Sequence, residues 1–341
     1  MTGQDNIIEL RGVDKSFEDT RALEGIDLSI SNGEFLTLLG PSGCGKTTIL
    51  RILSGFETPD QGDVSIGGQR MNDVPPERRQ VNTVFQNYAL FPHMTVRDNV
   101  AFGLRMQSCP KGEIEGRVLE ALRMVHLEQY ADRRPHQLSG GQQQRVAIAR
   151  ALVNNPAIIC LDEPLSNLDA KLRVQLRGEL KEMQKNFGIT TVYVTHDQEE
   201  ALTLSDCIAV FNNGRIEQIG TPNEIYNHSK TEFVCNFIGD INKLQPALLR
   251  ELSAQTGAAF APDKASYLRL ERVHVNMPAT EGFARFPAVI TNREYYGLYI
   301  KYTLSLCGQT IRAIEKNDGT KYFKAGEQVT ASIRPDDLMV Y

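Results

Sequence analysis

The 341-residue sequence predicts an α/β domain with a mainly parallel sheet, followed by a smaller all-β domain. Up to about residue 238, short apolar runs alternate with segments of helical periodicity, as in strands and helices built around a parallel sheet. One of these strands leads into a glycine-rich turn, and a helix follows the turn at once. Beyond Asp240 the chain shows short strands and few helix signals, which indicates a small barrel or sandwich. We therefore expect domains at 1–238 and 239–341.

Composition and charge exclude several classes of protein. The net charge of −5 lacks the basic excess that nucleic-acid binding usually requires, so we expect no nucleic-acid partner. The six cysteines are widely spread and form no CxxC pair, which argues against a zinc site or a disulfide framework and favours a reducing compartment. No apolar run approaches 18 residues and residues 1–5 do not resemble a signal sequence. We expect a cytosolic chain that acts at a membrane only through a partner.

The first strands lead to the glycine-rich turn. Residues 7–13 and 26–30 alternate apolar and polar side chains, and the apolar run 34–39 ends at the turn. The turn fits the pattern Gly, four residues, Gly-Lys-Ser/Thr of a phosphate-binding P-loop. Backbone N–H groups at the helix start attract an anion, and glycines allow close approach to phosphate. The predicted nucleotide ligands here are Gly40, Pro41, Ser42, Gly43, Cys44, Gly45, Lys46, Thr47 and Thr48.

The middle of the first domain is predicted to be a helical insertion. A short strand at 63–66 and another at 81–86, which ends at an amide, come before it. From about 88 to 151 the periodicity is helical, and the last helix spans about 142–152. Ser139 is suited to cap this helix, and the two glycines after it form a second anion-binding helix start.

Polar side chains follow the next strands. The apolar strand 157–161 ends at Asp162 and Glu163, a helix follows at 170–187, and the β-branched strand 189–194 leads to His196. A hairpin at 208–219 closes the domain. Because ligands of open α/β sheets bind at the carboxyl ends of the strands, these side chains and Gln86 are expected to converge near the phosphates.

Each of these side chains has a role in nucleotide hydrolysis and a simpler alternative. Asp162 and Thr47 are expected to bind Mg²⁺, and Gln86 can contact the metal while it orients the attacking water. Glu163 is placed to take the proton of that water, and His196 to donate to a γ-phosphate oxygen. The alternatives are a carboxylate pair that caps a loop, a surface amide and a structural histidine.

Residues 138–145, Leu-Ser-Gly-Gly-Gln-Gln-Gln-Arg, resemble the signature motif of ATP-binding cassette (ABC) ATPases. The P-loop, Gln86, the Asp162-Glu163 pair, residues 166–169 and His196 occur in that family's order, and the resemblance covers about 7–238. It implies the ABC cassette fold of the P-loop NTPases, with ATP and Mg²⁺ as cofactors. It also implies that two copies enclose two ATP molecules head to tail. The residues it assigns to ATP across the dimer are Ser139, Gly140, Gly141 and Gln142, with Asp169 linking the two sites.

The resemblance also bears on two residues near the nucleotide. It places an aromatic ring on adenine near Phe17, for which the residues alone leave a packing role equally open. Cys44 lies at a helix N-terminus, where a thiol is expected to have a lowered pKa. We therefore expect a thiol-alkylating reagent to inhibit ATP hydrolysis and MgATP to protect the protein.

Residues 81–96, 99–107 and 121–125 are similar to the ATPases of spermidine/putrescine importers. This implies a homodimer that works with two membrane permease subunits and a periplasmic binding protein, at the cytoplasmic face of a bacterial inner membrane. Iron(III), phosphonate and sugar remain alternative cargoes. A soluble ABC ATPase of DNA repair or translation is the rival class, although a second cassette, coiled-coil arms and a basic surface are all missing. Residues 88–94 either pack in the core or form a groove for a permease helix, and the β domain, expected to be OB-like, adds dimer contacts or regulation.

Overall fold

The computed structural model describes residues 6–261, 263–319 and 322–341 and divides into two compact units. The first unit ends at Ile225 and the second begins at Tyr226. The predicted boundary at 238/239 falls later, because α8 (Glu232–Phe237) is bonded to strands of the second unit. Arg269, for example, donates to the carbonyls of Cys235 and Ile238 at the end of that helix. The expectation about a signal sequence at residues 1–5 lies outside the described residues.

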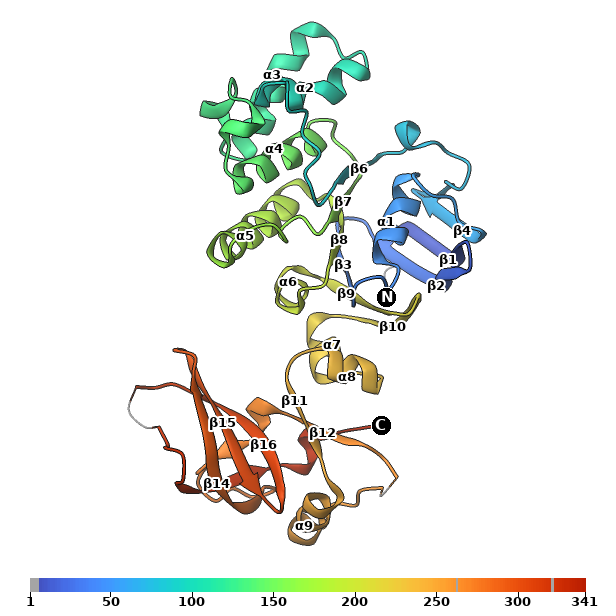
Figure 1. Cartoon of the computed structure of the whole chain (residues 1–341). Helices are drawn as coiled ribbons and strands as arrows, with labels where there is room; N and C mark the ends of the chain where they lie inside the picture. The colour runs from blue at the N-terminus through green and yellow to red at the C-terminus, as the bar shows by residue number, and fades with distance from the viewer. Residues whose placement is uncertain (1–5, 262, 320–321) are drawn as a thin grey trace. The chain divides into compact units, whose positions relative to one another are not determined.

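The first unit is built on a six-stranded sheet with the order β10-β9-β3-β8-β7-β6 (Figure 1). All neighbouring strands are parallel except β10, which is antiparallel to β9, so the prediction of a mainly parallel sheet is confirmed. β3 and β8 are buried along their whole length, which explains their apolar and β-branched sequences. The strands are β3 (Phe35–Leu39), β6 (Val81–Val84), β7 (Ile158–Asp162), β8 (Thr190–Thr195), β9 (Cys207–Asn212) and β10 (Arg215–Gly220).

A second, antiparallel sheet lies on the other side of helix α1 (Lys46–Ser54). Its order is β2-β1-β4-β5, and the helix is packed between the two sheets in one apolar core. Ile49 and Leu53 of the helix are fully buried there. The strands are β1 (Asn6–Phe17), β2 (Thr20–Ser31), β4 (Gln61–Ile66) and β5 (Gln69–Arg70).

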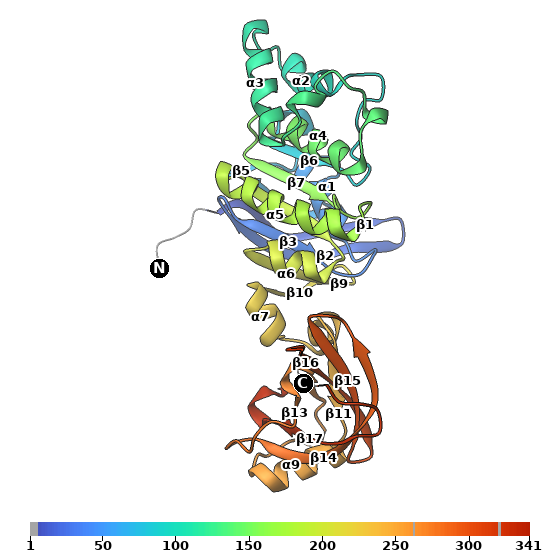
Figure 2. The same ribbon diagram turned by 90° about the vertical axis from the view of Figure 1, so that its left-hand side faces the viewer.

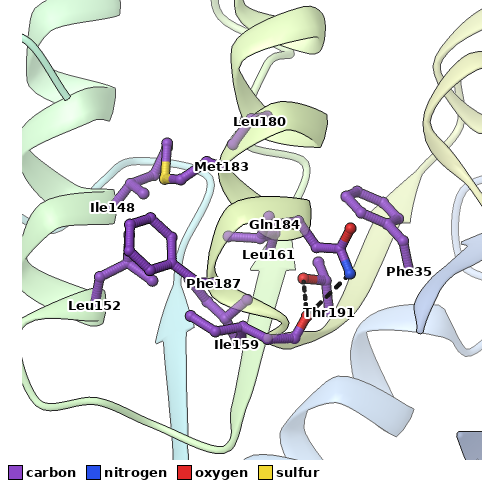
Figure 3. A pocket seen from close by; sticks show the side chains of 11 residues that line it. Phe35, Ile148, Leu152, Ile159, Leu161, Leu180, Met183, Gln184, Phe187 and Thr191 are labelled. Carbon is purple, nitrogen blue, oxygen red and sulfur yellow. Dashed lines mark hydrogen bonds between the residues drawn. The ribbon is translucent and has the colours of Figure 1, made fainter. Parts of the chain in front are cut away.

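Helices α4 (Gly140–Leu152), α5 (Ala170–Phe187) and α6 (Gln198–Leu204) cover the opposite face of the six-stranded sheet (Figure 2). A small apolar cavity lies between α4, α5 and the sheet (Figure 3). Gln184 and Thr191 both donate to the Ile189 carbonyl at its edge. None of the predicted site residues lines this cavity, so it is separate from the candidate nucleotide site.

The predicted helical insertion has its own core. α2 (Val96–Met106) and α3 (Lys111–Met124) pack against α4 around buried side chains such as Val100 and Leu122. The helices begin later than residue 88, because 88–95 form a loop that Thr95 ends by capping α2. Short 3₁₀ helices occupy Pro76–Arg78, Glu128–Tyr130, Pro135–Gln137, Leu270–Arg272 and Pro335–Asp337.

The second unit is mainly β-structure, as expected, with sheets β11-β12-β18 and β13-β17-β14-β15-β16 around one core. Helix α9 (Pro246–Thr256) was not predicted, and its Leu248 and Leu252 are fully buried in that core. In the described part of the chain, no helix has both the length and the apolar character needed to cross a membrane. The remaining elements are α7 (Pro222–Asn227), β11 (Ile241–Leu244), β12 (Ser266–Arg269), β13 (His274–Val275), β14 (Ala284–Tyr295), β15 (Tyr299–Leu306), β16 (Gln309–Lys316), β17 (Gln328–Ile333) and β18 (Met339–Val340).

Candidate nucleotide-binding site

The glycine-rich turn joins β3 to α1, as its sequence predicts. Gly45 has a φ of 106°, in the left-handed region, and a Cβ there would lie 2.6 Å from the Ala22 carbonyl oxygen. A Cβ at Gly40 would lie 2.4 Å from the Phe211 carbonyl oxygen. Both positions therefore require glycine. At Gly45 the backbone conformation and the nearby carbonyl both exclude a Cβ, and at Gly40 the nearby carbonyl alone excludes it. The turn leaves Ser42, Gly43 and Thr47 exposed at the start of α1, where backbone N–H groups can bind phosphate.

Lys46 is the buried cation of this loop. Its Nζ donates to the carbonyls of Gly40 at 2.8 Å and Pro41 at 2.7 Å, so the ammonium group is held inside the curve of the turn. The next residue, Thr47, donates through Oγ1 to Oδ1 of Asp162 at 3.3 Å. The loop and the end of β7 therefore meet, as the sheet topology predicts.

The expected lowered pKa of Cys44 is wrong. Its thiol is buried within the loop, and burial raises its pKa, outweighing the opposing effect of the nearby Lys46 ammonium group. The Lys46 Nζ lies 3.6 Å from Sγ, and Sγ faces Gly40. Cys44 does lie just before the start of α1, as predicted. Its side chain turns inward, however, where desolvation disfavours the thiolate.

Glu163 is the centre of a cluster at the carboxyl ends of the strands. Its Oε1 lies 3.1 Å from Nδ1 of His196, and its Oε2 accepts from Nε2 of Gln86 at 3.4 Å. Nε2 of Gln86 also lies 3.3 Å from the Ser166 hydroxyl. The structure thus brings together side chains from three separate parts of the sequence, which is the convergence that the strand order predicts.

Asp162 precedes Glu163 and lies at the last position of β7. Burial raises the pKa of its carboxyl group, the Thr47 hydroxyl works in the opposite direction, and the neighbouring Glu163 adds to the increase. Thr47 and Asp162 together offer a hydroxyl and a carboxylate oxygen, which suits Mg²⁺, a cation that takes few protein ligands and completes its shell with phosphate and water. Within residues 6–261, 263–319 and 322–341, no three His, Cys, Asp or Glu side chains gather into a metal site.

The loop that carries His196 is fixed by a buried carboxylate. Glu200 of α6 accepts from the hydroxyls of Tyr193 at 2.8 Å and Thr195 at 2.6 Å, both on β8. Asp197 caps α6 by accepting from the N–H groups of Glu199 and Glu200. Strand β8 and helix α6 are therefore bonded directly to each other on both sides of His196.

The signature segment forms a capped helix start. The Ser139 hydroxyl accepts from the Gln142 N–H at 3.3 Å, and the Gln142 side chain accepts from the Ser139 N–H at 2.9 Å. This capping box fixes the first turn of α4 with Ser139 and Gly140 exposed. Among the described residues, the Ser139 hydrogen bonds do not reach the P-loop of the same chain.

Two other predicted site residues have local partners. Asp169 caps α5 by accepting from the Leu172 N–H at 3.0 Å. Phe17 ends β1 and is 41 % exposed as a residue, and the Lys15 ammonium group lies 5.2 Å from its ring centroid. Their roles toward ATP and toward a second copy stay predictions.

Two arginines that support the site were not predicted. Arg79 is buried and donates to the carbonyls of Ile52 and Leu53 at the end of α1. Arg150, on α4, donates to two carbonyls just after Gln86. The contacts of Arg79 with the end of α1 and of Arg150 with the turn after Gln86 join residues more than twenty positions apart, so no local sequence pattern indicates them.

Two family models match the chain: ABC transporter over residues 23–166 and TOBE domain over 267–340. Among solved structures, the ATP-binding cassette MJ0796, in a dimeric structure with ADP and Pi, has a TM-score of 0.56 and 36 % identity. That match covers 63 % of this chain and 98 % of the cassette. The structure of cbiO1 from Clostridium perfringens has a TM-score of 0.61 and 34 % identity, and covers 65 % of this chain and 90 % of its own.

The chain belongs to the family of ABC transporter ATP-binding proteins, which bind ATP. Within that family it resembles the proteins named "Spermidine/putrescine import ATP-binding protein PotA". It is 67 % identical to the one from Nitratidesulfovibrio vulgaris over 248 residues, 73 % of this chain and 67 % of that protein. The Oleidesulfovibrio alaskensis protein is 68 % identical, over 72 % of this chain and 65 % of its own length. The Salmonella typhimurium protein is 60 % identical, over 73 % of this chain and 66 % of its own length. The matches thus span about two thirds of these curated relatives.

Proposed function

We propose that this chain is the ATP-hydrolysing subunit of a bacterial ABC importer whose cargo is a polyamine. The observation that carries the hydrolytic role is the contact of Glu163 with both Gln86 and His196, next to Asp162 and the P-loop. The polyamine cargo is supported by the names of relatives that are 60 to 68 % identical to this chain. Iron(III), phosphonate and sugar are the alternative cargoes.

The cluster around Glu163 supplies the groups that hydrolysis needs. The Glu163 carboxylate takes a proton from water as the water oxygen attacks the γ-phosphorus, and the bond from that phosphorus to the bridging oxygen breaks. Gln86 orients the water, since its amide lies on the Glu163 carboxylate. His196, on the other carboxylate oxygen, donates to a γ-phosphate oxygen as negative charge spreads over it.

Binding of the triphosphate requires the Lys46 ammonium group to turn from the two loop carbonyls to the β- and γ-phosphate oxygens. Thr47, Asp162 and Gln86 are the residues that would hold Mg²⁺ in this proposal, and the first two contact each other. When bound, the cation neutralises charge on the phosphate oxygens.

The second copy of the chain completes each site in this proposal. Ser139, Gly140 and Gly141 form a capped helix start with Ser139 and Gly140 exposed, which is suited to an anion, yet the hydrogen bonds of Ser139 stay within α4. A partner subunit can present the same helix start to the γ-phosphate, with Asp169 near the subunit boundary. Closed twofold pairs are the commonest symmetry for such assemblies.

The importer context supplies the remaining partners. We propose that the dimer acts on two permease subunits and a periplasmic binding protein, at the cytoplasmic face of the inner membrane. Residues 88–94 are the candidate groove for a permease helix, because they directly follow Gln86. ATP can drive transport only through its different affinity for open and closed dimers. The domain proposed at 239–341 would add dimer contacts or regulation.

Glu163→Gln tests the hydrolytic role. The amide keeps the size and polarity of the side chain but cannot accept the proton, so turnover should fall by roughly 10² to 10⁴. ATP binding should persist, and the variant should accumulate as a dimer with MgATP in analytical ultracentrifugation. Glu182→Gln, an exposed carboxylate on α5, is the matched control and should hydrolyse ATP normally. Near-normal turnover in Glu163→Gln would remove Glu163 as the base.

The cargo is tested separately. Vesicles that contain the chain with its permeases and binding protein should take up radiolabelled spermidine or putrescine when ATP is enclosed. Uptake should stop with Glu163→Gln. Transport of iron(III), a phosphonate or a sugar in place of polyamine would correct the cargo and leave the ATPase role intact. An ATPase that associates with DNA or ribosomes and not with permeases would favour the soluble rival class.

A further inference from the structure

The chain makes a strained double turn immediately after Gln86. The Tyr88 N–H donates to the Phe85 carbonyl at 2.8 Å, so Gln86 lies inside a four-residue turn. The Ala89 N–H then donates to the Asn87 carbonyl at 2.7 Å, which closes a three-residue turn centred on Tyr88. Tyr88 and Ala89 have φ values of 60° and 45°, so two successive residues with a Cβ are in the left-handed region. Such a conformation persists only where surrounding contacts hold it.

The buried hydroxyl of Tyr88 adds an unfavourable free-energy term to the backbone strain of the turn. The residue is 5 % exposed, and among the described residues its buried hydroxyl has no hydrogen-bond partner. A buried hydroxyl without a partner is unfavourable. The Tyr88 ring belongs to the apolar core that α4 shares with the sheet, so the position of Tyr88 depends on that packing and on interactions made by other groups of the turn.

Arg150 supplies those interactions from helix α4. Its Nη2 donates to the Tyr88 carbonyl at 2.8 Å and its Nη1 to the Ala89 carbonyl at 2.7 Å. The guanidinium group lies 5.5 Å from the ring centroid of Phe91, which follows the turn. A guanidinium group can hold two carbonyls at once because its donors are fixed in one plane.

This places Arg150 between two parts of the nucleotide site. Helix α4 begins at the signature segment with Ser139 as its cap, and Arg150 lies in its last turn. The other end of the contact is the turn that contains Gln86, whose amide touches Glu163. A rigid helix thus joins the signature segment to the residue beside the proposed base.

We propose that Arg150 is a positioning residue, which clamps the left-handed turn at Tyr88 and Ala89 and so couples the placement of helix α4 to that of Gln86. The clamp itself is a property of the folded chain. Its consequence for catalysis rests on the proposed function, in which Gln86 orients water for Glu163.

Hydrogen–deuterium exchange of the full chain without nucleotide tests the clamp itself. Arg150→Ala should raise the exchange rates of the Tyr88 and Ala89 amides on the order of tenfold, because both carbonyls lose a charged donor. Arg150→Lys should give a smaller increase, since one ammonium group does not reproduce the planar pair of donors. Arg145→Ala is the matched control: it removes an arginine of the same helix whose partner is Glu179 of α5. Unchanged exchange at Tyr88 and Ala89 in Arg150→Ala would overturn the proposal.

Ala89→Gly separates a clamp from a general effect on the helix. Glycine adopts a positive φ without strain, so the turn should need Arg150 less. Exchange in Arg150→Ala/Ala89→Gly should therefore return toward that of the unchanged chain. If Arg150→Ala does not fold, the same comparison is made with Arg150→Lys. Failure of Ala89→Gly to restore protection, with exchange raised along all of α4, would show that Arg150 acts only through helix stability and would overturn the clamp.

The catalytic consequence has its own readout. Arg150→Ala should lower kcat on the order of tenfold while the KM for ATP stays within about twofold, and Ala89→Gly should restore part of kcat. A raised KM with unchanged kcat would contradict coupling to Gln86. A chain that does not hydrolyse ATP at all would contradict the proposed function, while the exchange measurements would still decide the clamp.

Discussion

Glu163 has a left-handed backbone, with a φ of 44°. For a residue with a Cβ this conformation costs about 1–2 kcal/mol and needs support from its surroundings. The Glu163 N–H donates to the Val194 carbonyl at 3.0 Å, and the Glu163 carbonyl accepts from the Ser166 N–H at 3.2 Å. The neighbouring strand β8 therefore holds the bend that leaves the carboxylate between Gln86 and His196.

Because the Cys44 side chain points into the protein, the prediction for its reactivity with alkylating reagents changes. Because burial raises the pKa of its thiol, little thiolate forms at neutral pH, and alkylation should be slower than in the unfolded chain. The rate should increase as the pH rises toward the raised pKa, and should show no plateau below the ordinary value of 9.0. Site-resolved mass spectrometry of iodoacetamide labelling, in native and urea-unfolded chains, measures both rates. Faster labelling of Cys44 in the native chain would show that its thiolate is stabilised after all.

At the scale of elements, helix α4 meets helix α5 at a glycine. A Cβ at Gly141 would lie 2.8 Å from Cδ2 of Leu172 on α5, closer than real Cβ contacts. The first turn of α4, which carries Ser139, therefore packs against the end of the Leu172 side chain, which must move before a residue larger than glycine fits. The glycines of the signature segment serve helix packing as well as the proposed anion site.

Gly141→Ala should lower the free energy of unfolding by about 1 kcal/mol, because the added methyl group displaces the end of the Leu172 side chain. Urea denaturation followed by circular dichroism measures this change. Gly178→Ala is the matched control on α5, where a Cβ meets nothing within 4 Å, and should stabilise by up to about 1 kcal/mol. Leu172→Ala should recover part of the loss in Gly141→Ala, and no recovery would point to a cause other than this contact.

At the scale of the whole molecule, each compact unit has a core of its own. In the second unit, Asp240 connects three strands. It directly precedes β11, and its Oδ2 accepts a hydrogen bond from Nζ of Lys301 on β15 at 2.6 Å. Its Oδ1 lies 3.6 Å from Nη1 of Arg312 on β16. The hydrogen bond from Lys301, with the charges of both cations, lowers the pKa of the Asp240 carboxyl group. A lowered folded-state pKa means that the stabilisation is present above the unfolded-state pKa and is lost as the pH falls through the folded-state value.

Asp240→Asn should therefore destabilise the second unit at pH 7 but much less in acid. We expect a loss below about 1 kcal/mol, because the side chain is 52 % exposed and solvent screens the pair. The difference from the unchanged chain should shrink as the pH falls below the ordinary aspartate value of 3.8. Urea unfolding between pH 7 and pH 3 measures it, with the exposed carboxylate variant Glu281→Gln as control. A constant difference over this range would exclude the carboxylate charge as the cause.

Local patterns predicted most of the first unit. The P-loop and the apolar strand before it, the strand that ends at Asp162, and the Ser139 cap are each encoded within a few consecutive residues. Helix α9 was missed although Pro246 in its first turn and Gly257 at its end are helix signals, because Gln245 before it makes no side-chain cap and strands surround it in sequence. The convergence of Gln86, Glu163 and His196 followed from strand order, although their contacts did not.

Consecutive residues are sufficient to specify a nucleotide-binding loop, the strands that lead to its polar side chains, and membership of the ABC ATPases. This is because turn chemistry, helix capping and apolar periodicity act over a few residues. Only the folded structure shows three other features. These are the inward thiol of Cys44, the contact between α4 and α5 at Gly141, and the hydrogen bonds from Arg150 to the turn after Gln86. Burial, steric contact and hydrogen bonds at these three places involve segments far apart in sequence, so they exist only once the chain has packed.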